Sequence, residues 1–347
     1  MRRLLPAALL VLALLTAGCG GDDGASDPAA GGAAATTSTT GKASFPATVE
    51  HRFGTTTVKA EPRRIVIVGL TEQDTVLALG LKPIATTEWY GEQPHAVWPW
   101  AREALGDAKP TVLHAADGVD FEAVAELRPD LIIGTNSGID RKAYTKLSRL
   151  APTIPGPKGA TDYFSPWDVQ TQLIADALGR HDQGAKLIAD VKAGYAKAAA
   201  AHPEFRGKTV TFSQNAFYDG KLYVYPPGLG TEFLSDLGFT VNPKLKGMAP
   251  AGTQAEISAE RLDVIDTDVL VFATEKAADV KNLLKIPTFR PLKAVEGHRA
   301  VFTDPTLSGA MYFTTPLSLP YVLEHLTPLL EQAVAGKAPL AIHEPEA

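Results

Sequence analysis

Short apolar runs alternate with helix signals along most of the chain. The first such run, residues 64–69, is continuously apolar after its opening arginine, which is typical of a strand buried on both faces. A helix is predicted directly after it, with Thr71 as its N-cap and Gly80 supplying the left-handed conformation at its end. The pattern then predicts a strand at 83–87, a helix at 121–127 and a strand at 130–134. Strands that alternate with helices in this way indicate a parallel α/β organisation.

The same order of signals returns in the second half of the chain. The elements predicted there are a strand at 208–213, a hairpin at 218–225, a helix from Thr231 to Gly238 and a strand at 268–272. Two similar lobes are therefore expected, although short α/β signals also recur by chance.

An alanine-rich stretch lies between the two halves. Residues 182–202 carry apolar side chains at helical spacing, and Pro203 ends the pattern. A single helix of this length spans about 30 Å, and as a connection between lobes it predicts limited opening and closing. The alternative is an ordinary surface helix of the first lobe. The predicted organisation is an N-terminal lobe at 46–181, a connecting helix at 182–202 and a C-terminal lobe at 203–347.

The N-terminus has the three parts of a secretory signal peptide. Arg2 and Arg3 form a cationic head, residues 4–15 an apolar stretch and residues 16–18 a small-residue exit. The apolar stretch is too short to remain in the membrane as a spanning helix. Residues 1–18 are therefore expected to be removed.

Cys19, the single cysteine of the chain, directly follows this signal peptide. An Ala-Gly-Cys ending resembles the bacterial lipobox, in which the thiol is acylated and the chain is cut before the cysteine. The match departs at Thr16, where leucine is usual, and an ordinary signal peptide with an incidental cysteine is the alternative. Residues 20–44 contain no side chain able to build a core. We therefore expect 19–45 to be a lipidated cysteine with a flexible linker.

Composition and charge exclude several classes of partner and of metal site. Acidic residues outnumber basic ones 39 to 33 in 347 residues, a formal net charge of -6, and no cluster of lysine and arginine occurs. This balance argues against a nucleic-acid partner. A single cysteine excludes an internal disulfide, a cysteine-based zinc site and an iron–sulfur cluster. The eight histidines form no H-x-H or H-x-x-x-H pair, so no direct metal site is expected, although distant histidines can converge in a fold.

The catalytic motifs that the chain approaches are incomplete. The segment GTNSG at 134–138 carries its serine one position late for a nucleophile elbow. Gly228 and Gly230 could begin a dinucleotide fingerprint, but Phe233 occupies the place of the third glycine. We therefore expect a binding protein without a cofactor rather than an enzyme, with an unfamiliar secreted lipoprotein hydrolase as a remote alternative.

A set of motifs follows a defined order over residues 46–335. The motifs are RIV at 64–66, LGLKP at 79–83, PDLII at 129–133, ISAE at 257–260, DVLV at 268–271 and GHRAV at 297–301. Their order and spacing resemble the substrate-binding lipoproteins of ferric-siderophore ABC importers, which share their fold with vitamin B12 and haem binding proteins. The resemblance implies an α/β fold of two similar lobes, each a mainly parallel sheet flanked by helices. One long helix joins the lobes, as in class III periplasmic binding proteins.

The resemblance also implies that the filled protein docks on a membrane permease through one acidic residue on each lobe. It points to Glu72 or Asp74 in the first lobe and to Glu232 or Asp236 in the second. A first-turn acid is stabilised by the helix N-terminus and is expected to be exposed for an ion pair. Glu232 is preferred because Asp236 lies late in its helix, and the family's usual glutamate position holds Ser235 here. The plain alternative is that these acids only cap their helices.

Aromatic side chains gather in loops that follow predicted strands. Ligands of open α/β sheets lie outside the carboxyl ends of the strands, so these loops are expected to line a cleft. Such a wall suits a large, flat chelate that buries its faces against rings and offers polar edges to phenol hydroxyls. Each residue taken singly is more often a core residue. The predicted ligand-binding aromatics are Trp89, Tyr90, Trp98, Trp100, Tyr163, Trp167, Phe217, Tyr218, Tyr225 and Tyr312.

The ligand implied by the resemblance is an Fe(III)-siderophore complex. A monomer, lipid-anchored to the outer face of the bacterial cell membrane, would capture it and deliver it to the ABC permease in that membrane. A haem or cobalamin binding protein of the same fold is the alternative, with Tyr90, Tyr218 or His95 as candidate axial ligands of haem iron. An anionic ferric chelate would call for a cationic group in the cleft. The candidates are Arg102, Lys276 and Arg290.

Overall fold

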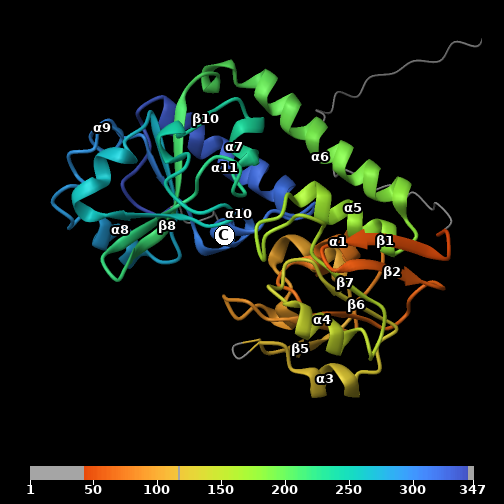
Figure 1. Ribbon diagram of the computed structural model, residues 1–347. Coiled ribbons are helices and arrows are strands. Elements are labelled where there is room, and N and C mark those ends of the chain that lie inside the picture. The colour runs from red at the N-terminus through yellow and green to blue at the C-terminus, as the bar shows by residue number, and fades with distance from the viewer. Residues whose placement is uncertain (1–42, 116–117, 343–347) are drawn as a thin grey trace, which may run out of the picture. The chain divides into compact units, whose positions relative to one another are not determined.

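The computed structural model describes residues 43–115 and 118–342. The signal peptide at 1–18, Cys19 and most of the predicted linker lie outside the described residues. The described chain begins with an antiparallel hairpin of β1 (Ala47–His51) and β2 (Gly54–Val58). All described residues belong to one compact unit of the chain. Within it, the first lobe extends to α5 and the second begins at β8 (Figure 1).

The first lobe contains a sheet of five parallel strands in the order β5-β4-β3-β6-β7. β3 (Ile65–Ile67) lies at its centre, between β4 (Ala85–Thr87) and β6 (Leu131–Gly134), and every residue of these three strands is buried. This burial confirms the strands predicted from apolar runs at 64–69 and 130–134, because central parallel strands are covered on both faces. The edge strands are β5 (Thr111–Leu113) and β7 (Thr153–Pro155).

Five helices and two short turns accompany this sheet. They are α1 (Glu72–Ala78), η1 (Pro94–Ala96), η2 (Pro99–Ala101), α2 (Arg102–Leu105), α3 (Phe121–Glu126), α4 (Arg141–Leu147) and α5 (Trp167–Ala177). After α1, Gly80 takes a φ of 78°, as its predicted role requires. The prediction of a capping Thr71 is wrong in its detail. Its side chain makes no cap bond, and its backbone N–H donates to Glu72 Oε2 at 3.0 Å.

The sheet of the second lobe is mixed rather than fully parallel. Its order is β11-β9-β8-β12-β13, with β10 beside the start of β8. β8 (Thr209–Tyr218) runs parallel to β12 (Val269–Ala273) and antiparallel to β9 (Lys221–Val224). The turn between β8 and β9 is the predicted hairpin, and both Asp219 and Gly220 have positive φ there. The remaining strands are β10 (Thr240–Val241), β11 (Ala255–Ser258) and β13 (Ala300–Phe302).

The helices of the second lobe contribute to two hydrophobic clusters, and the larger of the two contains residues of α7, α10 and α11. They are η3 (Pro203–Phe205), α7 (Glu232–Asp236), η4 (Pro243–Leu245), η5 (Ala259–Val264), α8 (Ala277–Leu283), α9 (Lys293–Glu296), α10 (Pro305–Tyr312) and α11 (Ser318–Val334). Leu326 and Leu330 of α11 pack in one cluster with Val271 of β12. First-lobe aromatics, among them Trp89 and Trp100, pack against the same cluster, so the two lobes share part of their apolar packing.

A single long helix, α6 (His181–Ala201), connects the lobes along one side of the molecule (Figure 1). It packs against α5 of the first lobe and against α7 and α11 of the second. Tyr195 of α6 donates a hydrogen bond of 3.0 Å to the carbonyl of Leu319. These contacts with both lobes fit a connecting helix better than a surface helix of the first lobe. No helix within the described residues combines the length and the apolar character needed to cross a membrane.

Candidate functional site: an aromatic cleft

A cleft of about 620 Å³, the main cleft, opens between the two lobes. First-lobe residues reach it from the loops after β3, β4 and β7. Second-lobe residues reach it from β8, β9, the segment after β12 and the end of α10. This is the end of a parallel sheet at which ligands are expected. Nine of its thirteen lining residues are aromatic: Trp89, Tyr90, Tyr163, Phe164, Tyr218, Tyr223, Tyr225, Tyr312 and Phe313. The other four are Leu70, Gln214, Gln254 and Glu275.

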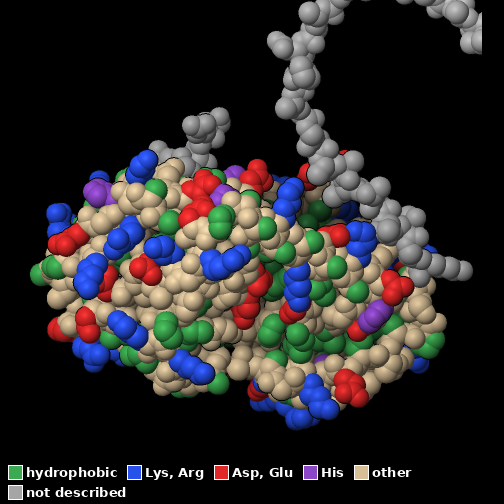
Figure 2. All heavy atoms as spheres, turned by 90° about the horizontal axis from the view of Figure 1, so that it is seen from above, with side chains coloured by type: hydrophobic (Ala, Val, Ile, Leu, Met, Phe, Trp, Pro, Cys, Tyr) green, Lys and Arg blue, Asp and Glu red, His purple; other side chains and the backbone are tan. Residues whose placement is uncertain are grey.

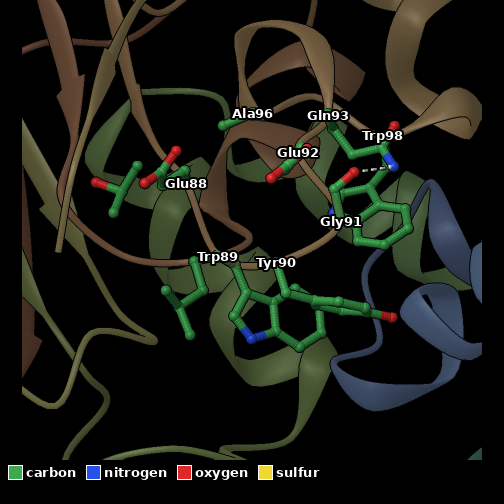
Figure 3. Close-up of a pocket in the computed structure, with 10 residues that line it drawn as sticks. Glu88, Trp89, Tyr90, Gly91, Glu92, Gln93, Ala96 and Trp98 are labelled. Atoms are coloured by element: carbon green, nitrogen blue, oxygen red, sulfur yellow. Dashed lines mark hydrogen bonds between the residues drawn. The ribbon is translucent and has the colours of Figure 1, made fainter. Parts of the chain in front are cut away.

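A second hollow of about 330 Å³, the side pocket, adjoins the main cleft and shares Leu70, Trp89 and Tyr90 with it. All of its lining residues come from the first lobe. Figure 3 shows the rings of Trp89 and Tyr90 beside each other and the carboxylates of Glu88 and Glu92 at the same pocket. Charged side chains of both signs are interspersed over the molecular face in Figure 2, so the acidic side chains of the pocket are a local feature.

The aromatic rings of the two lobes pack together at the main cleft. Between ring centroids, Trp89 lies 4.5 Å from Tyr90 and 4.9 Å from Phe313. Tyr312 lies 5.8 Å from both Trp89 and Tyr90. Phe164 extends this aromatic wall, with its centroid 4.9 Å from that of Phe313. Edge-to-face and tilted pairs are favourable ring geometries, so the wall links the lobes while it lines the cleft.

Trp98 and Trp100 lie behind this wall and support it. Their rings stack at 5.1 Å with an interplanar angle of 11°. Trp98 packs so closely on α10 that a Cβ atom on Gly309 would lie 2.5 Å from its ring. Trp100 donates a hydrogen bond of 2.7 Å from Nε1 to Asp74 Oδ2. Of these two predicted ligand residues, Trp98 lines only the side pocket and Trp100 lines neither hollow.

Phenol hydroxyls form a polar edge on the main cleft. Tyr312 OH lies 3.0 Å from Glu275 Oε1 and 3.0 Å from the carbonyl of Ala273. Burial is the main cause that raises the pKa of Tyr90, Tyr225 and Tyr312 far above the usual value for tyrosine. Near neutral pH these phenols are therefore uncharged, and they offer hydroxyl groups rather than phenolates to a ligand.

Six of the predicted aromatic ligand residues line the main cleft: Trp89, Tyr90, Tyr163, Tyr218, Tyr225 and Tyr312. Trp167 does not, because it begins α5 and is buried in the hydrophobic core. Phe217 packs against the apolar cluster on the other side of β8. Successive side chains of a strand point to opposite faces, so Tyr218 reaches the cleft and Phe217 does not.

The three predicted cationic residues line neither hollow. Arg102 in α2 donates to Gln93 Oε1 at 2.8 Å, beside the side pocket. Lys276 is exposed at the start of α8, and Arg290 donates from Nε to the carbonyl of Leu284 at 2.8 Å. The charged side chains that line the two hollows are all glutamates: Glu88, Glu92 and Glu275.

Several lining residues were not among the predicted set. Glu275 follows β12 by two residues, so the rule that ligands lie at carboxyl ends of strands could have found it. Phe313 directly follows Tyr312, but a single aromatic after a helix carries no sequence signal of its own. Gln214 and Gln254 come from positions with no distinctive pattern, and only the fold brings them to the cleft.

Glu72 and Asp74 are each 2% exposed, which contradicts the prediction that they present carboxylates at the surface. Glu72 Oε1 accepts from the N–H of Asn136 at 2.7 Å. Asp74 Oδ2 accepts from Trp100 Nε1 and from Thr315 Oγ1, each at 2.7 Å. Burial raises the pKa of Asp74 to about 6, although both hydrogen bonds oppose the shift. The first turn of α1 is covered by neighbouring loops, so its acids serve packing contacts.

The acids of α7 are more accessible. Glu232 is half-buried and Asp236 is exposed. Asp168, at the start of α5, lies near both, and Lys192 of α6 approaches Asp168 with Nζ 2.6 Å from Oδ2. Burial, together with the charges of Asp236 and Asp168, raises the pKa of Glu232. A group of three acids with one cation therefore forms where α5, α6 and α7 meet.

One group of side chains within the described residues has the arrangement of a metal site: His202, Glu204 and Glu331. His202 Nδ1 lies 3.1 Å from Glu204 Oε1 and 3.0 Å from Glu331 Oε1. His202 and Glu204 follow the end of α6, Glu331 lies in α11, and the group lines neither hollow. His95, a candidate haem ligand, lies with Nδ1 3.2 Å from the carbonyl of Pro110 and also lines neither hollow.

Comparison with known proteins gives matches over most of the chain. The model of a family described as periplasmic binding protein matches residues 65–307. The probable siderophore-binding lipoprotein YfiY of Bacillus subtilis (strain 168) is 30% identical over 244 residues, 68% of this chain and 71% of the relative.

Solved structures are similar over a larger share. A periplasmic solute binding protein from Mycobacterium smegmatis is 38% identical with a TM-score of 0.77, covering 83% of this chain and 98% of that one. PiaA of Streptococcus pneumoniae in complex with ferrichrome is 25% identical with a TM-score of 0.72, covering 84% of this chain and 99% of that one. The fold is therefore shared with proteins of this kind.

Proposed function

The chain belongs to the periplasmic binding protein family, and on that premise we propose that it captures a ferric siderophore outside the cytoplasm and delivers it to an ABC importer. The observation that carries the proposal is the main cleft, about 620 Å³ between the lobes and walled mostly by aromatic rings. Rings of this kind bury the faces of a chelate, and the phenol hydroxyls at the edge serve its polar groups.

The composition of the cleft supports a metal that arrives already wrapped by its chelator. Its lining contains no histidine and no cysteine among the described residues. Burial raises the pKa of Tyr90, Tyr225 and Tyr312, and a neutral phenol is a poor ligand for a metal ion. The same property weakens the haem alternative, since an axial tyrosine must lose its proton to bind iron and His95 lies away from the cleft.

Delivery requires exposed groups that a permease can recognise. In the second lobe we propose one of two acids of α7: Glu232, which is half-buried, or Asp236, which is exposed. In the first lobe the buried Glu72 and Asp74 cannot serve, and we propose Asp140 instead. Asp140 is exposed and caps α4, with Oδ1 accepting from the N–H of Ala143 at 2.7 Å.

The position of Asp140 relative to the cleft supports this choice. It ends the loop that follows β6, and Gly138 of that loop lies under the ring of Tyr163, a residue of the main cleft. A Cβ atom at Gly138 would lie 2.6 Å from Tyr163 OH. A partner that contacts Asp140 would therefore also lie close to one wall of the main cleft.

Attachment to the membrane completes the proposed function. Cys19 would carry the lipid, and the linker that follows it would keep the folded part beside the permease in the cytoplasmic membrane. YfiY, the relative from Bacillus subtilis, is itself named a lipoprotein. We propose that the protein acts in this way as a monomer. We also propose that it acts as a binding protein rather than as an enzyme, since its family consists of binding proteins.

Ligand titration tests the proposal. The mature protein, purified in detergent, is titrated with ferric hydroxamates, ferric catecholates, haem and cobalamin while tryptophan fluorescence is followed. Quenching by a ferric siderophore is expected, and Trp89→Phe should remove most of it because Trp89 lines the main cleft. Trp167→Phe is the matched control, because Trp167 lies in the core. Quenching by haem or cobalamin alone would assign the alternative ligand, and no quenching by any of them would refute the proposal.

A further inference from the structure

The charged groups of the two hollows all have the same sign. Glu275 lines the main cleft, and Glu88 and Glu92 line the adjoining side pocket. Glu88 is paired at the surface, with Oε1 2.6 Å from Nδ1 of His114. Neither lining contains a lysine, an arginine or a histidine. A ligand in the cleft therefore meets carboxylates and neutral phenols.

Glu275 holds the most consequential position among these carboxylates. It is half-buried and accepts a hydrogen bond from Tyr312 OH at 3.0 Å, which turns Oε1 toward the aromatic wall. No cation of the described chain lies within ion-pair distance, 4.0 Å, of its carboxylate. Its charge contributes to raising the pKa of Tyr90 and Tyr225. The negative charge of Glu275 therefore influences residues of both lobes that line the cleft.

Ferric chelates differ in net charge according to their chelating groups. Three hydroxamates, each a monoanion, neutralise the charge of Fe(III), and an added ammonium arm makes the complex cationic. Catecholates are dianions and citrate carries several carboxylates, so their ferric complexes are anionic. In a partly desolvated cleft, an unpaired carboxylate repels an anion and attracts a cation by energies that water would otherwise screen.

On the basis of the proposed function, we infer that the main cleft takes ferric chelates of zero or positive net charge, of the tris-hydroxamate class. Glu275 is the residue that discriminates against anionic chelates. It is a specificity-determining residue, whereas the aromatic wall supplies the affinity common to all ferric chelates. This assignment replaces the expectation of a cationic cleft group, which was derived for an anionic chelate.

Four probes of different charge test the inference by tryptophan quenching: ferrichrome, which is neutral, ferrioxamine B, which carries an ammonium arm, a ferric tris-catecholate and ferric citrate. The unmodified protein should bind the two hydroxamates at least about tenfold more tightly than the two anions. Raising the salt concentration should weaken ferrioxamine B and leave ferrichrome unchanged. This salt series needs no variant, so it holds whatever a substitution does to folding.

Glu275→Gln keeps the shape of the side chain and an acceptor for Tyr312 OH. It should lower the affinity for ferrioxamine B about tenfold and raise that for the ferric tris-catecholate by a similar factor, with ferrichrome unchanged. Glu296→Gln, an exposed position of α9 with the same change of net charge, should alter none of these affinities. Unchanged ratios in Glu275→Gln, or tighter binding of the anions by the unmodified protein, would overturn the inference and leave the proposed function standing. Binding of no ferric chelate at all would refute both.

Discussion

Asp74 in α1 accepts a hydrogen bond of 2.7 Å from Thr315 Oγ1, a residue 241 positions later in the chain. The bond joins the first lobe to the segment that begins α11 in the second. Trp100 donates to the same oxygen. One buried carboxylate therefore binds both Trp100, which supports the aromatic wall, and Thr315 of the other lobe. Asp74 Oδ1 is buried without a hydrogen-bond partner, which is the condition under which a charged carboxylate is costly.

Stability should depend on pH through Asp74. Its pKa rises from 3.8 to about 6 in the folded protein, so its contribution to the free energy of unfolding is complete below about 4 and is lost as the pH rises through about 6. In Asp74→Asn this loss is absent, and between pH 4 and pH 8 the variant should gain roughly 3 kcal/mol relative to the unmodified protein. Urea denaturation at both pH values measures the difference.

Asp107→Asn is the control for this measurement, because Asp107 is exposed. Its free energy of unfolding should follow that of the unmodified protein at both pH values. A parallel pH dependence in Asp74→Asn would show that Asp74 ionises in the folded protein as it does in water.

Replacing the partner in the other lobe should also lower stability. Thr315 Oγ1 donates to Asp74 and accepts from the N–H of Ser318 at 2.9 Å, so Thr315→Val removes a link between the lobes and a contact at the start of α11. A loss of about 1–3 kcal/mol is expected from the carboxylate left with one fewer donor. Thr315→Ser keeps the hydroxyl and should lose much less. Thermal unfolding of the two variants compares them, and a Thr315→Val variant as stable as Thr315→Ser would show that the hydrogen bond to Asp74 contributes nothing.

Two helical glycines should respond in opposite ways to substitution by alanine. A Cβ atom on Gly309 of α10 would lie 2.5 Å from the ring of Trp98, so Gly309→Ala should displace that ring and cost about 1–3 kcal/mol. Ligand affinity should fall as well, because Trp98 lies 5.1 Å from Tyr90 of the main cleft.

Gly194 of α6 is the matched control for Gly309. A Cβ atom there would lie 3.6 Å from Leu323 Cδ2, an ordinary contact, and Gly194→Ala should add about 0.5–1 kcal/mol through helix propensity. Chemical denaturation gives both values. A neutral result for Gly309→Ala would mean that Trp98 can move without loss.

Charge reversal at the proposed docking acids should separate delivery from capture. Asp140→Lys and Glu232→Lys are expected to reduce cellular iron uptake roughly tenfold or more, while the affinity of the purified protein for its ferric chelate stays unchanged. Asp236→Lys, measured in parallel, identifies which acid of α7 contacts the permease. Loss of chelate affinity in any of them would place that residue in the binding site instead.

The local sequence pattern predicted the central strands and the hairpin most accurately. The apolar run at 64–69 predicted a strand buried on both faces, and β3 is buried throughout. Asp219 and Gly220 predicted a tight turn, because few residues tolerate a positive φ. Trp89 and Tyr90 lie at the predicted cleft because loops after parallel strands meet at one end of a sheet. Tyr312 reaches the same cleft from the end of α10 rather than from a loop.

Exposure and side-chain direction could not be predicted in the same way. Glu72 and Asp74 have the spacing of first-turn helix acids, yet both are buried, since their neighbours Asn136 and Thr315 come from distant parts of the chain. Trp167 resembled the other loop tryptophans in sequence, and its place at the start of α5 directs it into the core.

By itself, then, the sequence determined the order of strands and helices, the connecting helix and the aromatic character of the cleft, because these depend on periodicity and residue type over short distances. Only the tertiary structure decided which acids are buried, which tryptophans support the wall, and that the charge of the cleft is negative. Burial and net charge at a site are sums over residues from many segments, and only the packed chain brings those segments together.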